Sequence, residues 1–257
     1  MTRHLRLQLD NHVGWLEFNR SPVNAFNHEM VQEVLEALHH YEADRAVRVV
    51  VFASALDEYF SAGADLGIFV GIGQDGMASL CDQLHEVIHA IRNSKKPMLA
   101  AIHGKAVGGG LEMTLHCDVR FAADNASLGQ PEVNINFIPP LGTTQSLARL
   151  IGQPRALKYL YDGELLSAQN AAKLGLVDEL VPAEALRSTV QGYAESLCNK
   201  PPEALASIRR SIIEGGGCNF DEGLQIERAE VIKLAASGNF EEGVNAFLDK
   251  RPPRWHR

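Results

Sequence analysis

The chain has 257 residues and a net charge of −8, because 24 Lys and Arg residues face 32 Asp and Glu residues. Hydrophobic residues make up 46% and charged residues 22%, which is typical of globular proteins and excludes a disordered or fibrous chain. The acidic balance argues against nucleic-acid binding, since phosphate backbones are recognised by clustered cations. No apolar stretch approaches the ~20 residues of a membrane helix, so no membrane association is expected.

Four cysteines, at positions 81, 117, 198 and 218, have no C-x-x-C spacing. The first ten residues contain no apolar signal segment, so we expect no export. Cysteines in a chain of this size without an export signal are typically reduced thiols. These features together predict a cytoplasmic protein.

The first half of the chain predicts two strands, a helix and a buried strand. Residues 4–19 alternate between apolar and polar side chains around Asp10 and Asn11, which predicts an antiparallel hairpin. Residues 27–41 carry apolar side chains at helical spacing, with Asn27 as the predicted N-cap. The apolar run 47–55 is rich in β-branched residues, which is typical of a strand covered on both faces. The Gly-rich segment 61–76 predicts a surface connection.

Strands, glycine turns and helices then recur before the pattern becomes wholly helical. We predict a helix over about 78–93, a strand at 97–104, an amphipathic helix after the glycines of 104–118, and a strand at 119–123. From about residue 186 onward only helical patterns remain. This order predicts an α/β core over residues 1–195 and a helical C-terminal region over residues 196–257.

The sequence His85-Glu86-Val87-Ile88-His89 matches H-E-x-x-H, a zinc peptidase motif. The apolar side chains of the same helix form one stripe, and the two histidines fall on the opposite side. A catalytic zinc needs an enclosed, oriented site, so we predict two solvated histidines and no metal.

Gly71, Gly73 and Gly76 have the G-x-G-x-x-G spacing of a dinucleotide fingerprint. That fingerprint requires an acidic residue at the end of the next strand, about 20 residues later. The next predicted strand ends at His103 without a carboxylate, so we predict a flexible loop and no nicotinamide or flavin site.

Two glycine-centred turns follow apolar strands and could bind an anionic oxygen. The first is Ser61-Ala62-Gly63-Ala64-Asp65-Leu66, and the second, Gly108-Gly109-Gly110-Leu111-Glu112, opens a predicted helix. Glycine allows close approach of backbone to a ligand, and N–H groups at a helix start point outward. Glu112 lies about one turn after Gly109 and leans back toward that helix start. A second acid, Glu132, follows in Gly129-Gln130-Pro131-Glu132.

These motifs, in this order and spacing, resemble the crotonase (enoyl-CoA hydratase/isomerase) superfamily. The matching segments are residues 24–27, 47–51, 61–66, 96–97, 108–112, 117–118, 129–132, 142–145, 175–178 and 246–251. The resemblance covers nearly the whole chain. It implies an α/β fold built as a spiral of ββα units, with a helical C-terminal region that forms trimers, often paired into hexamers.

The resemblance also implies the substrate and the site residues. It assigns the two oxyanion donors to the N–H groups of Ala64 and Gly109, and the two acid–base residues to Glu112 and Glu132. It implies an acyl-CoA substrate bound by a set of residues around these turns: Ala62, Asp65, Leu66 and Gly110. No cofactor beyond the coenzyme A of the substrate is implied.

We therefore expect an enoyl-CoA hydratase that adds water across the C2=C3 bond of a 2-enoyl thioester. Ionised Glu112 would take a proton from the water, and protonated Glu132 would give one to C2. A double-bond isomerase, a decarboxylase, a thioester hydrolase and a noncatalytic acyl-thioester-binding subunit remain alternatives.

The chain departs from the family pattern at three positions. Glu58 and Gly67 stand where lysines often bind CoA phosphates, so Lys250, Arg251 or a neighbouring subunit would have to compensate. Pro140 replaces a glycine whose N–H could hold the water. Asn134, Asn136 and Thr143 are the candidate substitutes.

Overall fold

The computed structural model describes residues 2–255 and places ten strands in two sheets. The larger sheet has the order β1-β2-β3-β5-β7-β10 and is parallel except for the β1–β2 hairpin. Its strands are β1 (Leu5–Asp10), β2 (Val13–Phe18), β3 (Val49–Ser54), β5 (Met98–Ile102), β7 (Val119–Ala123) and β10 (Glu179–Val181). The smaller sheet consists of β4 (Tyr59–Ser61), β6 (Lys105–Val107), β8 (Ser127–Gly129) and β9 (Leu165–Ser167).

The chain alternates between the two sheets and adds a helix after each pair of strands. The successive units are β3-β4-α2, β5-β6-α3 and β7-β8-α4, with the first strand of each in the large sheet and the second in the small one. The helices are α2 (Gly73–Asn93), α3 (Gly109–Thr114) and α4 (Thr143–Ile151). This arrangement confirms the predicted spiral of ββα units. It brings the ends of β4, β6 and β8 together, since these strands are neighbours in one sheet.

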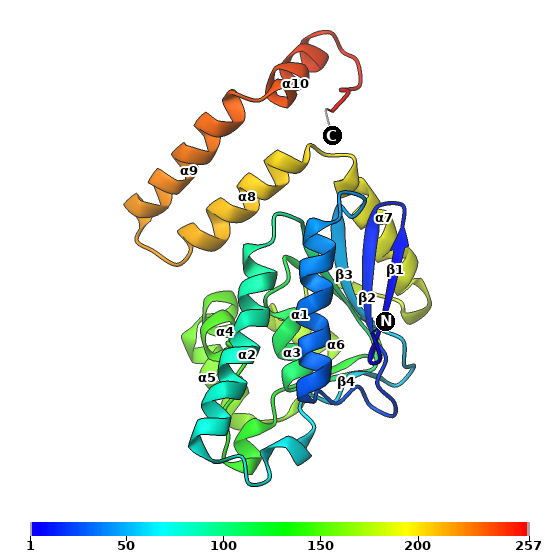
Figure 1. Ribbon diagram of the computed structural model, residues 1–257, viewed down its shortest axis with the longest axis vertical. Helices are drawn as coiled ribbons and strands as arrows, with labels where there is room; N and C mark the ends of the chain where they lie inside the picture. The colour runs from blue at the N-terminus through cyan, green and yellow to red at the C-terminus, as the bar shows by residue number, and fades with distance from the viewer. Residues whose placement is uncertain (1, 256–257) are drawn as a thin grey trace.

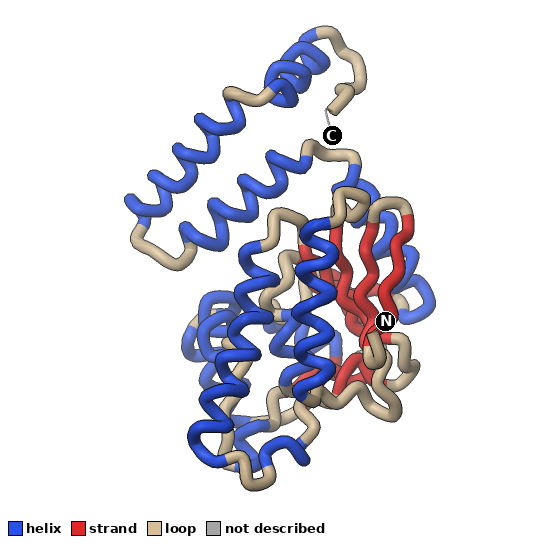
Figure 2. Tube along the Cα trace, in the orientation of Figure 1, coloured by secondary structure: helices blue, strands red, loops and turns tan. Residues whose placement is uncertain are grey.

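The remaining helices cover the core and build the C-terminal region. Helices α1 and α2 lie side by side in front of the large sheet (Figures 1 and 2), and α7 packs against β2, β3, β5 and β7. These helices are α1 (His28–Ala43), α5 (Gln153–Asp162), α6 (Ala168–Leu174), α7 (Leu186–Cys198), α8 (Pro202–Gly215), α9 (Phe220–Ala235) and α10 (Gly238–Leu248). Short 3-10 turns are η1 (Leu66–Phe69), η2 (Glu132–Ile135) and η3 (Ala183–Ala185).

Most elements expected from the sequence are present, including the hairpin and the buried strand β3. Asn27 caps α1, its side chain accepting a hydrogen bond from the amide of Met30. The apolar stripe of α2 is buried as predicted. The start of α2 was predicted about five residues too late, and Gly73 and Gly76 lie in its first turn rather than in a loop. Glycine has a low helix propensity, so only the packing of the helix against the core places its start there.

The prediction of an amphipathic helix after the triple glycine is wrong. Helix α3 has six residues, and every one of them is buried. The helix contacts β4 and β6, so it has no solvent face. Its single charged residue, Glu112, is therefore inside the protein. A charge in that position needs a reason other than solvation.

Helices α8, α9 and α10 project away from the core (Figure 1). Arg209 of α8 anchors them: its guanidinium donates to both Oδ atoms of Asp118 at 2.9 Å and to the carbonyls of Ile91, Arg92 and Ser94. The predicted boundary at residue 195 falls within α7, and Met1, His256 and Arg257 lie outside the described residues. Within residues 2–255, no helix combines the length and apolarity that crossing a membrane requires.

Candidate active site

The turn after β4 presents the amide of Ala64 to a cavity. Phe26 and Ala64 form a parallel bridge in which the Phe26 amide donates to Gly63 and the Asp65 amide donates to Phe26. In such a ladder the intermediate residue points its own N–H group to the other side. No acceptor for the Ala64 amide is found in the described chain, and Ala64 lines the cavity on that side.

The turn after β6 meets the first turn directly. Gly63 has a φ of +86°, and a Cβ atom placed there would lie 2.9 Å from the Val107 oxygen and 3.3 Å from the Gly109 nitrogen. This contact is between backbones, so neither side can yield to a side chain. Gly109 is the first residue of α3, and N–H groups at a helix start have no intrahelical partner. The amides of Ala64 and Gly109 therefore lie at one end of the same cavity.

Glu132 lies against this second turn. A Cβ atom at Gly108, which has a φ of +49°, would lie 2.7 Å from Oε1 of Glu132. The buried Gln130 amide group, in the orientation that satisfies its hydrogen bonds, donates to Glu132 Oε1 at 3.2 Å and Oε2 at 3.0 Å. The missing side chain at Gly108 thus makes room for the carboxyl group, and Gln130 fixes it there.

Glu112 projects into the cavity from the buried helix α3. Its Oε2 atom accepts a 2.8 Å hydrogen bond from the Leu141 amide. Its Oε1 atom has no partner at hydrogen-bond distance and angle, and the buried Thr143 hydroxyl also has none, among residues 2–255. The Leu141 amide therefore holds one oxygen of the carboxyl group, while Thr143 lies beside the group and stabilises its charged form without a bond of normal geometry.

Both carboxyl groups hold a proton more tightly than usual. Burial raises the pKa of Glu112 to about 8, and the nearby charge of Glu132 adds to the rise, while Thr143 and Leu141 oppose it. Burial also raises the pKa of Glu132 to about 7, and its own amide opposes the rise. Two acids that share a low-dielectric cavity do not both ionise easily, so the pair carries a proton near neutral pH. That proton belongs to the pair rather than to either residue alone.

The cavity has a volume of about 270 Å³ and a mostly apolar wall. Its polar groups are concentrated where the two turns and the two glutamates meet. Phe69 and Phe137 pack with their ring centroids 5.3 Å apart and their planes tilted by 51°, and both form part of the wall. Other apolar lining residues are Phe26, Val31, Leu66, Ile68, Leu80, Leu84, Met113, Ile135, Pro140 and Leu141. A chain of hydrocarbon next to one polarised group fits such a wall.

The residues expected to bind the substrate divide into two groups. Ala62 and Leu66 line the cavity. Asp65 does not: its carboxylate pairs with Arg20 at 3.0 Å and accepts from the Gly67 amide. Gly110 lies behind the wall, where a Cβ atom would meet that of Ser61 at 2.5 Å. Asp65 and Gly110 therefore hold the two turns in place.

The departures from the family pattern also have structural consequences. Arg251, one candidate to bind CoA phosphates, instead forms a bidentate ion pair with Glu242, with N–O distances of 2.7 and 3.0 Å. Pro140 lines the cavity without an N–H group. Of the three candidate substitutes, Asn134 is exposed but lines the cavity, and Asn136 is exposed and does not. Thr143 is buried beside Glu112, behind the residues that line the cavity.

The histidine motif of α2 lies outside this site. His85 and His89 are exposed on the solvent side of the helix, as predicted. Within the described part of the chain, the side chains that lie close enough together to bind a metal ion are in a different place: His4, Glu29 and Glu33. The Glu33 carboxylate there already accepts from the amides of Arg3 and His4.

Sequence reasoning missed three contributions to the site. Gln130 belongs to a recognised motif but carried no signal for its bonds to Glu132. The Leu141 amide is a backbone group, so residue type gives no indication of it. His116 donates to the Leu141 carbonyl across 25 residues of sequence, and no local pattern reports such a contact.

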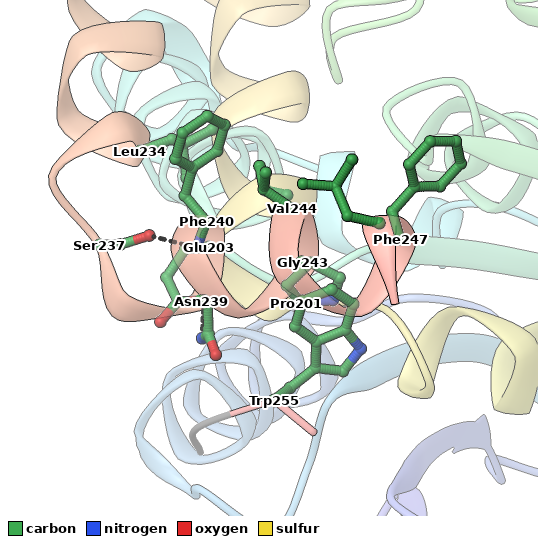
Figure 3. A pocket seen from close by; sticks show the side chains of 12 residues that line it. Pro201, Glu203, Leu234, Ser237, Asn239, Phe240, Gly243, Val244, Phe247 and Trp255 are labelled. Carbon is green, nitrogen blue, oxygen red and sulfur yellow. Dashed lines mark hydrogen bonds between the residues drawn. The ribbon is translucent and has the colours of Figure 1, made fainter. Parts of the chain in front are cut away.

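A second cavity, of about 390 Å³, lies in the C-terminal region, far along the chain from the glutamates. Figure 3 shows Phe240, Val244 and Phe247 on α10 together with Trp255, which lies near Gly243. The exposed surface of this second cavity is almost entirely apolar, and Phe247 is 84% exposed. The one carboxyl group among the described residues that line it, that of Glu203, accepts a 2.9 Å hydrogen bond from Asn239.

The fold and the first cavity define an α/β protein with paired backbone amides and paired carboxyl groups at one apolar site. A sequence model of the enoyl-CoA hydratase/isomerase family matches residues 8–257. The chain is 33% identical to a probable enoyl-CoA hydratase of Bacillus subtilis (strain 168), with 98% of both chains covered. It is 32% identical to a crotonyl-CoA hydratase of Syntrophomonas wolfei, with 95% of both covered. The crystal structure of an enoyl-CoA hydratase from Geobacillus kaustophilus HTA426 superposes with a TM-score of 0.96 at 31% identity, covering 99% of this chain and 97% of that one. The chain belongs to the enoyl-CoA hydratase/isomerase family.

Proposed function

We propose that the protein is an enoyl-CoA hydratase that adds water across the C2=C3 bond of a 2-enoyl-CoA. The observation that carries the proposal is the meeting of Glu112, Glu132 and the amides of Ala64 and Gly109 at one apolar cavity. The relatives named above as enoyl-CoA and crotonyl-CoA hydratases support the choice of substrate.

The proposed reaction begins with the thioester oxygen at the two amides. Addition of water at C3 moves negative charge onto this oxygen, and each aligned N–H donor contributes about 3 kcal/mol in comparable sites. One ionised carboxyl group takes a proton from the water, and one protonated carboxyl group gives a proton to C2. A C–O bond forms at C3 and a C–H bond at C2 while the C2=C3 π bond and one O–H bond of water break. The net oxidation state does not change, so the reaction as written uses no cofactor beyond the coenzyme A of the substrate.

We assign the base role to Glu112 and the acid role to Glu132. Burial raises the pKa of both acids, so the pair carries a proton near neutral pH, and this assignment places it on Glu132. The Leu141 amide supports the ionised form of Glu112. The buried Thr143 hydroxyl is the proposed replacement for the amide that Pro140 lacks.

The test follows the loss of enoyl-thioester absorbance with crotonyl-CoA and longer 2-enoyl-CoAs. Glu112→Gln and Glu132→Gln should each lower kcat by at least 10²-fold, the scale of a lost proton-transfer group. Glu86→Gln, the same change on the exposed face of α2, is the matched control and should retain full activity. Hydration that survives the double variant would refute the assigned roles. Conversion of 3-enoyl-CoA without hydration would favour an isomerase.

We further propose that copies of the chain assemble through α8–α10 into a trimer or hexamer in the cytoplasm. Exposed apolar side chains there, including Phe220 at 81% and Phe247 at 84%, support an interface. The four free cysteines fit a reducing compartment. Sedimentation of the protein and of Phe247→Glu tests the assembly: a wild-type monomer would refute it.

A further inference from the structure

His116 is a buried histidine that the proposed reaction does not use. It lies just beyond α3, is 6% exposed, and does not line the cavity. Its Nε2 atom lies 2.7 Å from the Leu141 oxygen. A carbonyl oxygen only accepts, so Nε2 must carry the proton in this contact. Nδ1 is then a bare acceptor, and it has no partner among residues 2–255.

The backbone of Leu141 connects His116 to Glu112. The Leu141 carbonyl accepts a hydrogen bond from His116 at 2.7 Å, and the Leu141 amide donates to Glu112 Oε2 at 2.8 Å. The two groups belong to adjacent peptide planes that meet at the Leu141 Cα, so the bond from His116 restricts the backbone angles that aim the Leu141 amide at Glu112. Leu141 also lies next to the oxyanion turn, since its Cδ1 would be 3.5 Å from a Cβ at Gly109.

Packing around His116 leaves this segment little freedom. Gly142 has a φ of +76° and lies between Ile88 of α2 and the His116 ring, which a Cβ atom there would approach to 3.1 and 3.2 Å. Burial lowers the pKa of His116 to about 4, and the charges of Arg92 and Arg120 act in the same direction. The ring is therefore neutral throughout the useful pH range.

We propose that His116 is a positioning residue that fixes the backbone of Leu141 so that the Leu141 amide holds the carboxyl group of Glu112. This inference rests on the proposed function, because it takes Glu112 to be an acid–base residue. The role is specific to the Nε2 donor. A side chain that only fills the same volume does not perform it.

The test compares His116→Gln with His116→Met. Both side chains have the same length, but only glutamine places an N–H donor near the position of Nε2. We expect the Met variant to lose about 10-fold in kcat with KM within about two-fold, because the interaction acts on catalysis rather than binding. The Gln variant should retain kcat within about three-fold. His103→Met is the matched control, since His103 makes the same 2.7 Å Nε2 contact to the Leu56 carbonyl elsewhere.

A second readout measures Glu112 directly and does not require turnover. The pKa of Glu112 can be followed by 13C NMR of labelled glutamate carboxyls, with the signal assigned by comparison with E112Q. This pKa should rise by about 0.5 to 1 pH unit in the Met variant only, because the ionised carboxylate there loses a strong donor. Equal kcat and equal Glu112 titration in the Gln and Met variants would overturn the role of His116. If the Met variant does not fold, His116→Asn serves as the variant without a donor, because the asparagine amide group ends short of the Nε2 position. A wild-type protein that hydrates no enoyl-CoA would refute the proposed function, while the NMR comparison would still decide the role of His116.

Discussion

The substitution Gly108→Ala tests whether the position of Glu132 determines activity. The new Cβ atom would start 2.7 Å from Oε1 of Glu132, whereas ordinary contacts begin near 3.4 Å. The carboxyl group must therefore move by about 0.7 Å, away from the place where Gln130 holds it. A displacement of about 1 Å in a catalytic group can cost about 10²-fold in rate, so we expect kcat to fall by about 10- to 100-fold with little change in KM.

Stability and activity should separate in this experiment. Alanine at the positive φ of Gly108 should cost about 1–3 kcal/mol of unfolding free energy, as at other strained positions. Gly152→Ala is the matched control, because Gly152 has a φ of +83° and nothing within 4 Å of the new Cβ. It should lose comparable stability and keep wild-type kcat.

The assay combines denaturant unfolding with steady-state hydration of crotonyl-CoA on both variants. A folded Gly108→Ala protein with wild-type kcat would refute the reasoning. Equal losses of kcat in the two variants would also refute it, because strain alone would then explain the effect.

Three further substitutions test other parts of the structure. Gly63→Ala should lower kcat by at least 10²-fold, because the new Cβ atom would push the turns that carry the Ala64 and Gly109 amides apart, and no side chain there can yield. Crotonyl-CoA hydration measures kcat, and a wild-type value would contradict the prediction. The wild-type unfolding free energy should fall as pH rises from about 5 to about 8, because the raised pKa of Glu112 means that the folded state binds a proton that the unfolded state has released. Urea titrations should show a smaller fall for Glu112→Gln. An unchanged pH dependence in this variant would contradict the role of Glu112 in the effect. Arg209→Met should cost about 1–3 kcal/mol, because three backbone carbonyls and the partly exposed carboxylate of Asp118 lose their donor. Arg209→Lys should restore only part of the Tm, because lysine cannot form the same set of hydrogen bonds.

The sequence supported most of the fold through local patterns. Alternation predicted the β1–β2 hairpin, helical spacing with Asn27 predicted α1, and the β-branched run predicted β3. Each signal depends on neighbouring residues, which is why one sequence suffices to detect it. The failures had a tertiary cause. Helix α3 is buried on all sides although Glu112 indicated a polar face, and α2 begins in glycines that disfavour a helix.

The sequence by itself determined the two glycine turns and the two acids, because each is a short motif with its own chemistry. Only the tertiary structure decided how these groups act on one another. It placed Glu132 against Gly108, raised the pKa of both acids by burial, and connected His116 to Glu112 through the Leu141 backbone. Dielectric environment and backbone orientation depend on what surrounds a residue in space, and residues distant in sequence supply those surroundings.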